Sequence, residues 1–181
     1  MKKFKDLTEK QQRVRIIKDA IAQIKLKNFK ISTGNYLKFP VGTDGNTYYP
    51  TDTESIQKTL TERKCECCAK GAVFAACVLN VNKVYGKDDY GNEDFQKKKL
   101  RKWFKPLELD MMETAFEGRV CEDSTDKLQA QTGAEDYWGD QEWEPTGLGK
   151  ECIKFGSKYK NPRNRLMAIL ENILEFGTFK P

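Results

Sequence analysis

The cysteines are the residues of this chain whose type and spacing could support chemistry, either metal binding or nucleophilic catalysis. Four of the six cysteines fall within thirteen positions: Cys65, Cys67, Cys68 and Cys77. Cys65 and Cys68 have the spacing of a zinc knuckle, but no second pair follows, and Cys121 and Cys152 stand singly. The chain contains no histidine, so a thiol also lacks the usual base that would make it a nucleophile. We therefore expect reduced thiols that pack as small apolar side chains, with no metal and no cofactor.

Basic residues point to an anionic ligand. Residues 97–104 combine a basic cluster with two aromatic side chains, and Arg163 and Arg165 lie in the first turn of the last expected helix, where free N–H groups attract anions. A glycine break at Gly34 would let backbone N–H groups approach such a ligand. We expect a phosphate-bearing small molecule to contact Thr33, Gly34, Tyr36, Arg163 and Arg165, with Tyr36 as a stacking face. The alternative is a solvated basic surface.

A segment of opposite charge occupies residues 119–147. It holds eight acidic and two basic residues, a net charge of −6, which leaves +11 for the rest of a chain whose total is +5. Its later part carries aromatic side chains among the acidic ones. Such tryptophans either fold back onto the body or contact a partner. In the second case the partner-binding residues are Tyr137, Trp138 and Trp143.

Hydrophobic periodicity places these residues on mainly helical elements. We expect helices over 9–27 after a Thr8/Gln11 capping box, around Ile56 and Leu60, over 65–80, over 94–104, over 106–118 and from Asn161 to Gly177. Residues 29–39 partly alternate, which indicates a small β-hairpin near 29–49 with its second strand at 47–49. Residues 119–150 lack periodicity and predict a long excursion that is mobile or functional.

These elements predict one predominantly α (α+β) domain over residues 1–181. About six helices surround a buried central helix at 65–80, because that segment is apolar on most of its circumference. The 38% hydrophobic content is sufficient for a core of this kind. No run approaches the length of a membrane span and no apolar segment follows the basic start, so we expect a cytoplasmic chain with no membrane partner.

Four motifs occur in order along the chain: Thr33-Gly-Asn-Tyr36, Cys65-x-x-Cys68-Ala-x-Gly-Ala72, Glu113-Thr-Ala-Phe-Glu-Gly118, and the C-terminal Glu171-Asn-Ile-Leu-x-x-Gly-Thr-Phe-x-Pro181. With these motifs the chain resembles a family of small proteins encoded by bacteriophages and prophages. The resemblance implies a phage origin and a host-cytoplasm setting, and it supplies no catalytic residues. Cys67 and the acidic residues 134–145 depart from the family pattern.

From these features we expect a non-enzymatic phage accessory protein that counters host defence by sequestering a phosphate-bearing nucleotide signal. One alternative is an inhibitor that binds a host defence protein through the acidic, tryptophan-bearing segment. The other is a metal-dependent hydrolase that uses carboxylates such as Glu113 and Glu117. The mild net charge disfavours nucleic acid as a partner, and homo-oligomerisation stays open.

Overall fold

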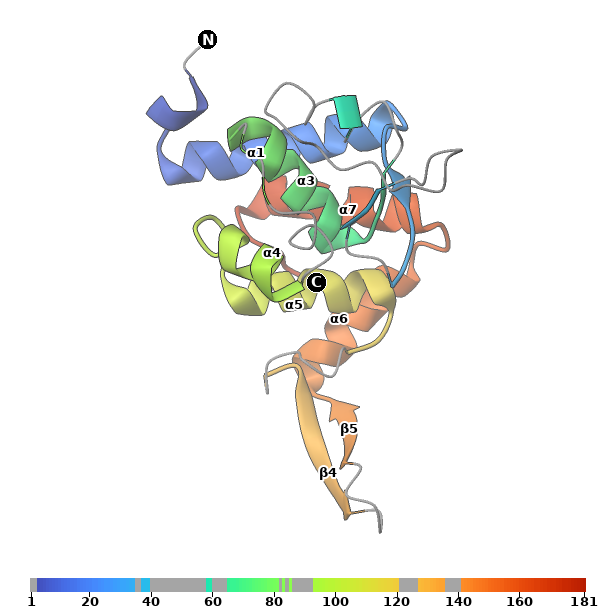
Figure 1. Cartoon of the computed structure of the whole chain (residues 1–181). Helices are drawn as coiled ribbons and strands as arrows, with labels where there is room; N and C mark the ends of the chain where they lie inside the picture. The colour runs from blue at the N-terminus through green and yellow to red at the C-terminus, as the bar shows by residue number, and fades with distance from the viewer. Residues whose placement is uncertain are drawn as a thin grey trace.

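The computed structural model describes residues 3–34, 37–39, 58–59, 65–81, 83, 85, 93–120, 127–135 and 141–181. Its helices are η1 (Phe4–Asp6), α1 (Glu9–Lys25), α3 (Ala69–Val81), α4 (Glu93–Leu100), α5 (Pro106–Glu117), α6 (Gly147–Ser157) and α7 (Pro162–Phe176). The strands are β1 (Lys30–Ile31), β2 (Leu37–Lys38), β3 (Glu66–Cys67), β4 (Gln129–Glu135) and β5 (Gln141–Pro145). The predicted helix-dominated α+β class is confirmed (Figure 1).

The helix ends follow from local capping chemistry. The Thr8 hydroxyl accepts from Gln11 N and the Gln11 side chain accepts from Thr8 N, which completes the predicted capping box of α1. Glycine ends two helices in the left-handed conformation, Gly118 after α5 at φ +76° and Gly177 after α7 at φ +74°. The predicted bounds of the first, fifth and last helices therefore agree with the structure to within a few residues.

Helix α3 is the centre of the core. Every residue from Ala69 to Val78 is buried, because α3 packs against α1 on one side and against α4 and α5 on the other. Helix α7 runs through the same central layer and contacts both α1 and α5 (Figure 1). Its buried stripe consists of Leu166, Ile169, Leu170 and Ile173. The terminal helix thus closes the core, as its periodicity predicts.

The small sheet differs from the predicted hairpin. Its strand order is β1-β3-β2, so β3 lies between the two strands of the 29–39 region and pairs parallel to β1 and antiparallel to β2. Backbone bonds from Lys30 N to Cys65 O and from Ser32 N to Cys67 O hold this register. Because Glu66–Cys67 form β3, the helix expected over 65–80 begins only at Ala69. The strand expected at 47–49, and Ile56 and Leu60, lie outside the described residues.

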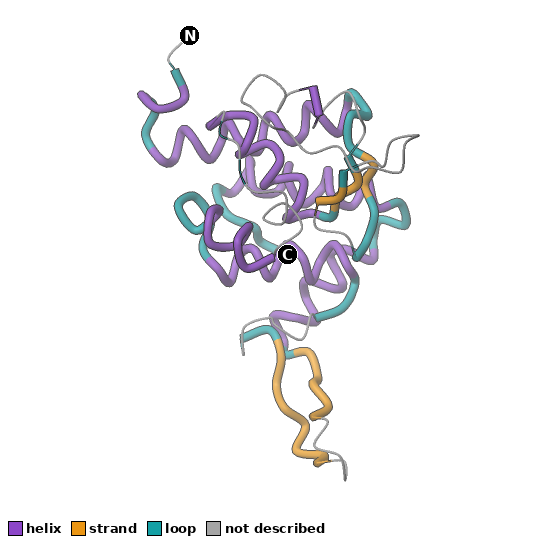
Figure 2. The backbone as a smooth tube through the Cα atoms, viewed as in Figure 1, coloured by secondary structure: helices purple, strands orange, loops and turns teal. Residues whose placement is uncertain are grey.

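The expected excursion over 119–150 contains regular structure that periodicity missed. Strands β4 and β5 form an antiparallel hairpin that projects from the helical body (Figure 2). Helix α6 follows at once, and the Thr146 hydroxyl accepts from Gly149 N at its start. In the described part of the chain, no helix combines the length and apolarity that crossing a bilayer requires.

Candidate functional site

The predicted phosphate contact at Gly34 is occupied by a carboxylate of the chain itself. Gly34 has φ +76°, and its N–H donates to both oxygens of Glu117 at 3.1 Å. Burial raises the pKa of the Glu117 carboxyl above its ordinary value, while the Gly34 bond and the positive charges of Arg119, Arg165 and Lys70 oppose that shift. Gly34 therefore meets an anionic group, which is the end of α5 rather than a ligand.

The two predicted arginines join helices together. Arg163 donates through Nη2 to Ile24 O at 2.8 Å and to Lys25 O at 3.1 Å, at the end of α1. Arg165 donates to Phe116 O and, at 3.2 Å, to Tyr159 O. Both guanidinium groups thus satisfy C-terminal carbonyls of neighbouring helices.

The start of α7 is also less open to an anion than the sequence suggests. The Asn161 side chain accepts from the backbone N–H groups of Arg163 and Asn164, which are donors that a phosphate would need. Among the predicted ligand residues, the structure brings Gly34 and Arg165 together around Glu117. Thr33 is exposed beside them, and Tyr36 lies outside the described residues.

One of the predicted partner-binding residues, Trp143, lies on the projecting hairpin. Trp143 is in β5, where its backbone pairs with Gln131 of β4. Tyr137 and Trp138 fall between the strands, outside the described residues. Partner binding by this segment stays a prediction.

The described cysteines are free and buried. Burial raises the pKa of the Cys65, Cys68, Cys77 and Cys152 thiols to about 12, and the pKa of Cys67 well above its ordinary value. A thiol protonated at neutral pH is a poor nucleophile and a poor zinc ligand. Among the described residues, no group of three or more Cys, Asp and Glu side chains could hold a metal ion.

A buried ionic cluster lies where α3, α4 and α5 meet. Lys70 pairs with Glu113 and lies 3.8 Å from Asp110, and Lys97 lies 3.6 Å from the same Asp110 oxygen. Two lysines and two carboxylates balance, so the cluster carries no net charge. Glu113, one of the carboxylates that the hydrolase alternative uses, is thereby engaged in the core, and Glu117 is engaged by Gly34.

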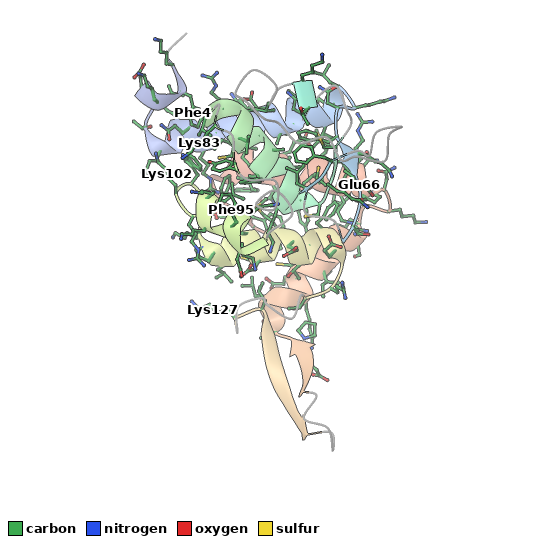
Figure 3. The ribbon with its side chains drawn as sticks, viewed as in Figure 1. Phe4, Glu66, Lys83, Phe95, Lys102 and Lys127 are labelled. Carbon is green, nitrogen blue, oxygen red and sulfur yellow. The ribbon has the colours of Figure 1, made fainter. Side chains whose placement is uncertain are left out.

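A pocket elsewhere on the surface combines cationic and aromatic side chains. We call it the lysine–aromatic pocket; it is lined by Lys3, Phe4, Lys5, Gln12, Asn80, Val81, Lys102 and Trp103. Its volume is about 610 Å³, which falls in the range of small-molecule sites. It is built from η1, α1, the end of α3 and the connection after α4. Phe4 and Lys102, which both line it, appear on the same side of the helical body (Figure 3).

Gln12 connects two parts of the pocket lining through its side-chain hydrogen bonds. The Gln12 amide nitrogen donates to Phe4 O at 3.0 Å and to Leu7 O at 3.1 Å, and its oxygen accepts from the Trp103 indole N–H at 2.8 Å. The Trp103 carbonyl is held separately by Arg13 Nη1 at 3.1 Å. These bonds orient the indole and attach the N-terminal segment to α1, and such pre-ordering is what lowers the entropy cost of binding at a site.

The pocket presents positive charge beside aromatic rings. The Phe4 and Trp103 ring centroids are 6.1 Å apart, and Lys102 Nζ lies 5.3 Å from the Trp103 centroid. In the described structure, no carboxylate pairs with Lys3, Lys5 or Lys102. This combination suits a ligand with a flat ring and phosphate groups, since lysine binds phosphate and aromatic faces stack on bases.

None of the predicted ligand residues lines this pocket, although the sequence contains a signal for part of it. Lys102 and Trp103 belong to the basic, aromatic cluster 97–104, which the sequence analysis weighed as an anion site. The other half, Lys3-Phe4-Lys5, shows the same pairing of lysine with an aromatic ring. That local signal was available, but nothing in the sequence indicates that the two segments meet.

Comparison of the chain with known family models, curated proteins and solved structures gives no match.

Proposed function

We propose that this chain is a non-enzymatic binding protein for a phosphate-bearing nucleotide, which it holds in the lysine–aromatic pocket. The observation that carries the proposal is the pairing of three lysines with two aromatic rings in a pocket of about 610 Å³. Following the resemblance to phage proteins, we extend the proposal to a counter-defence role in the host cytoplasm. In that role the protein sequesters a nucleotide signal of the host immune response.

Sequestration fits the chemistry of the pocket better than turnover does. Its described lining offers lysines, amides, rings and one valine, and none of these described residues has a carboxylate or thiol that could act as base or nucleophile. Gln12, which could orient a water, has its amide committed to Phe4, Leu7 and Trp103. A cationic pocket whose described lining holds no carboxylate or thiol is suited to retaining a nucleotide intact.

A thermal-shift screen with cyclic dinucleotides, ADP-ribose derivatives and mononucleotides tests the proposal, because a ligand that binds only the native state raises the melting temperature. Hits are then measured by calorimetry at two salt concentrations. Binding should weaken at the higher salt, since exposed lysine–phosphate attraction is screened. Recovery of the unaltered nucleotide after denaturation would exclude hydrolysis.

Matched lysine variants locate the site. Lys102→Gln should weaken binding by about twofold to fivefold, the loss expected for one exposed ion pair. Lys127→Gln makes the same charge change at an exposed lysine near the base of the projecting hairpin (Figure 3), and it should leave the affinity unchanged. Equal effects of both variants would contradict a site in the lysine–aromatic pocket. Loss of binding in Arg165→Ala alone would move it to the Gly34 region.

A second candidate function rests on the projecting hairpin. Strands β4 and β5 extend away from the helical body (Figure 1), and residues 128–149 contain five acidic and no basic residues. This arm suits a basic surface of a host defence protein. Glu142→Gln combined with Glu144→Gln should leave nucleotide binding intact under the first proposal. Under the second, the same double variant should abolish protection of phage in host cells.

A further inference from the structure

The lysine–aromatic pocket and the projecting hairpin carry opposite charge. The pocket is lined by three exposed lysines, Lys3, Lys5 and Lys102, and no described residue of its lining is acidic. Residues 128–149, which include both strands of the hairpin, contain five acidic residues and no basic one. Because surfaces of opposite charge attract each other across solvent, the hairpin is electrostatically complementary to the pocket.

The projecting hairpin extends away from the helical body of its own chain (Figure 1). Strand β4 has seven residues, which at about 3.3 Å per residue give a length of about 23 Å. A two-stranded hairpin is only marginally stable on its own in water, so a surface that holds it would stabilise it. The hairpin is therefore long enough to reach a neighbouring molecule and gains stability by doing so.

The hairpin and the pocket lie on opposite sides of the helical body. Phe4 and Lys102, which line the pocket, lie on the side of the body away from the hairpin, and Lys127 marks the base of the hairpin (Figure 3). Since the hairpin points away from the body, it does not fill the pocket of its own chain. The two complementary surfaces therefore meet between separate copies of the protein.

We propose that the projecting hairpin of one copy docks on the lysine–aromatic pocket of a second copy. Carboxylates of the hairpin, among them the exposed Glu144, pair with the pocket lysines. Strand β5 also supplies a tryptophan, a residue type that packs well on aromatic rings such as those of Phe4 and Trp103. The contact is small and its ion pairs are exposed, so the association is weak and reversible. It does not depend on nucleotide binding.

Sedimentation velocity of the full chain at low salt tests this self-association. The sedimentation coefficient of wild type should rise with protein concentration and return to the monomer value at high salt, which screens exposed charges. Glu142→Lys combined with Glu144→Lys, the hairpin variant, should weaken the association by about tenfold or more, because two attractions become repulsions. Wild type that stays monomeric at every concentration in low salt overturns the inference.

A matched pair of variants locates the surface that receives the hairpin. Lys5→Glu combined with Lys102→Glu, the pocket variant, should weaken the association as strongly as the hairpin variant does. Lys10→Glu combined with Lys18→Glu makes the same charge change at two exposed lysines of α1 that do not line the pocket, and it should have little effect. Circular dichroism checks that each variant is folded. Equal losses in both double variants would overturn docking on the pocket.

Mixing the two defective variants gives the sharpest test. The pocket variant keeps an intact hairpin and the hairpin variant keeps an intact pocket, so the mixture should form a complex that neither variant forms alone. A mixture that stays monomeric overturns the inference. Nucleotide affinity is measured in dilute protein, where the copies are separate. A nucleotide screen without hits therefore overturns the proposed function and leaves this inference standing.

Discussion

Helix α6 approaches the backbone of helix α5 closely at Gly156. A Cβ atom added at Gly156 would overlap the Ala115 carbonyl oxygen and lie 2.8 Å from the Ala115 carbonyl carbon. Ordinary carbon contacts are about 3.5–4.0 Å, so the two helices would have to separate by about 1 Å. The obstacle is helix backbone, which cannot rotate aside as a side chain can. Gly156→Ala should therefore push α6 away from the core.

Two opposing effects determine how much Gly156→Ala changes the free energy of unfolding. Alanine is favoured over glycine inside a helix by about 1 kcal/mol, whereas overpacking typically costs 1–3 kcal/mol and occasionally more. Because the clash is with backbone, we place its cost at the upper end, about 3 kcal/mol or more. The net destabilisation is then about 2 kcal/mol, which corresponds to a fall of about 4–8 °C in the melting temperature.

Urea denaturation followed by circular dichroism measures this difference, with Gly147→Ala as the matched control. Gly147 is the first residue of the same helix, and nothing lies within 4 Å of the Cβ that the substitution adds. The control should stay within about 0.5 kcal/mol of wild type. If Gly156→Ala proves as stable as wild type, helix propensity outweighs the clash and the close approach of α5 and α6 is wrong.

Three further predictions concern the core and its titratable groups. Ile169→Ala, at a fully buried position of α7, should cost about 2–5 kcal/mol, and an unchanged melting temperature would show that α7 is peripheral. The buried thiols, with a pKa of about 12 at Cys68 and Cys77, should resist thiol reagents at pH 8 until the protein unfolds; about one zinc per chain by elemental analysis would refute their structural role. Because burial raises the pKa of Glu117, its contribution to stability is largest below the unfolded pKa and is lost as pH rises through the folded pKa. Glu117→Gln should flatten that part of the stability–pH curve, and an identical curve in the variant would contradict the shift.

Local signals in the sequence predicted most helix positions. Thr8 with Gln11, Pro106 with Gly118, and Asn161 with Gly177 mark helix ends through bonds made within a few residues, so they can be read without knowing the fold. The order β1-β3-β2 could not be read in this way, because β3 reaches the sheet from a distant part of the chain. Helix α6 was missed because three glycines weaken its periodicity. Two of them, Gly149 and Gly156, lie where a Cβ would overlap backbone, so packing rather than propensity explains them.

The difference between local signals and long-range contacts also explains why the candidate site is the lysine–aromatic pocket and not the predicted residues around Gly34 and Arg163. Arg163 and Arg165 have the residue type and the place on a helix that bind an anion, but folding brings carbonyl groups of α1 and α5 to them. Gly34 has the backbone freedom that a ligand needs, and folding brings Glu117 to it. A sequence shows which groups can bind an anion, but not which of them the fold has already satisfied. Lys3, Lys5 and Lys102 have no described carboxylate partner, and they lie beside the Phe4 ring and the Trp103 indole that Gln12 orients, which is why we propose the ligand site there.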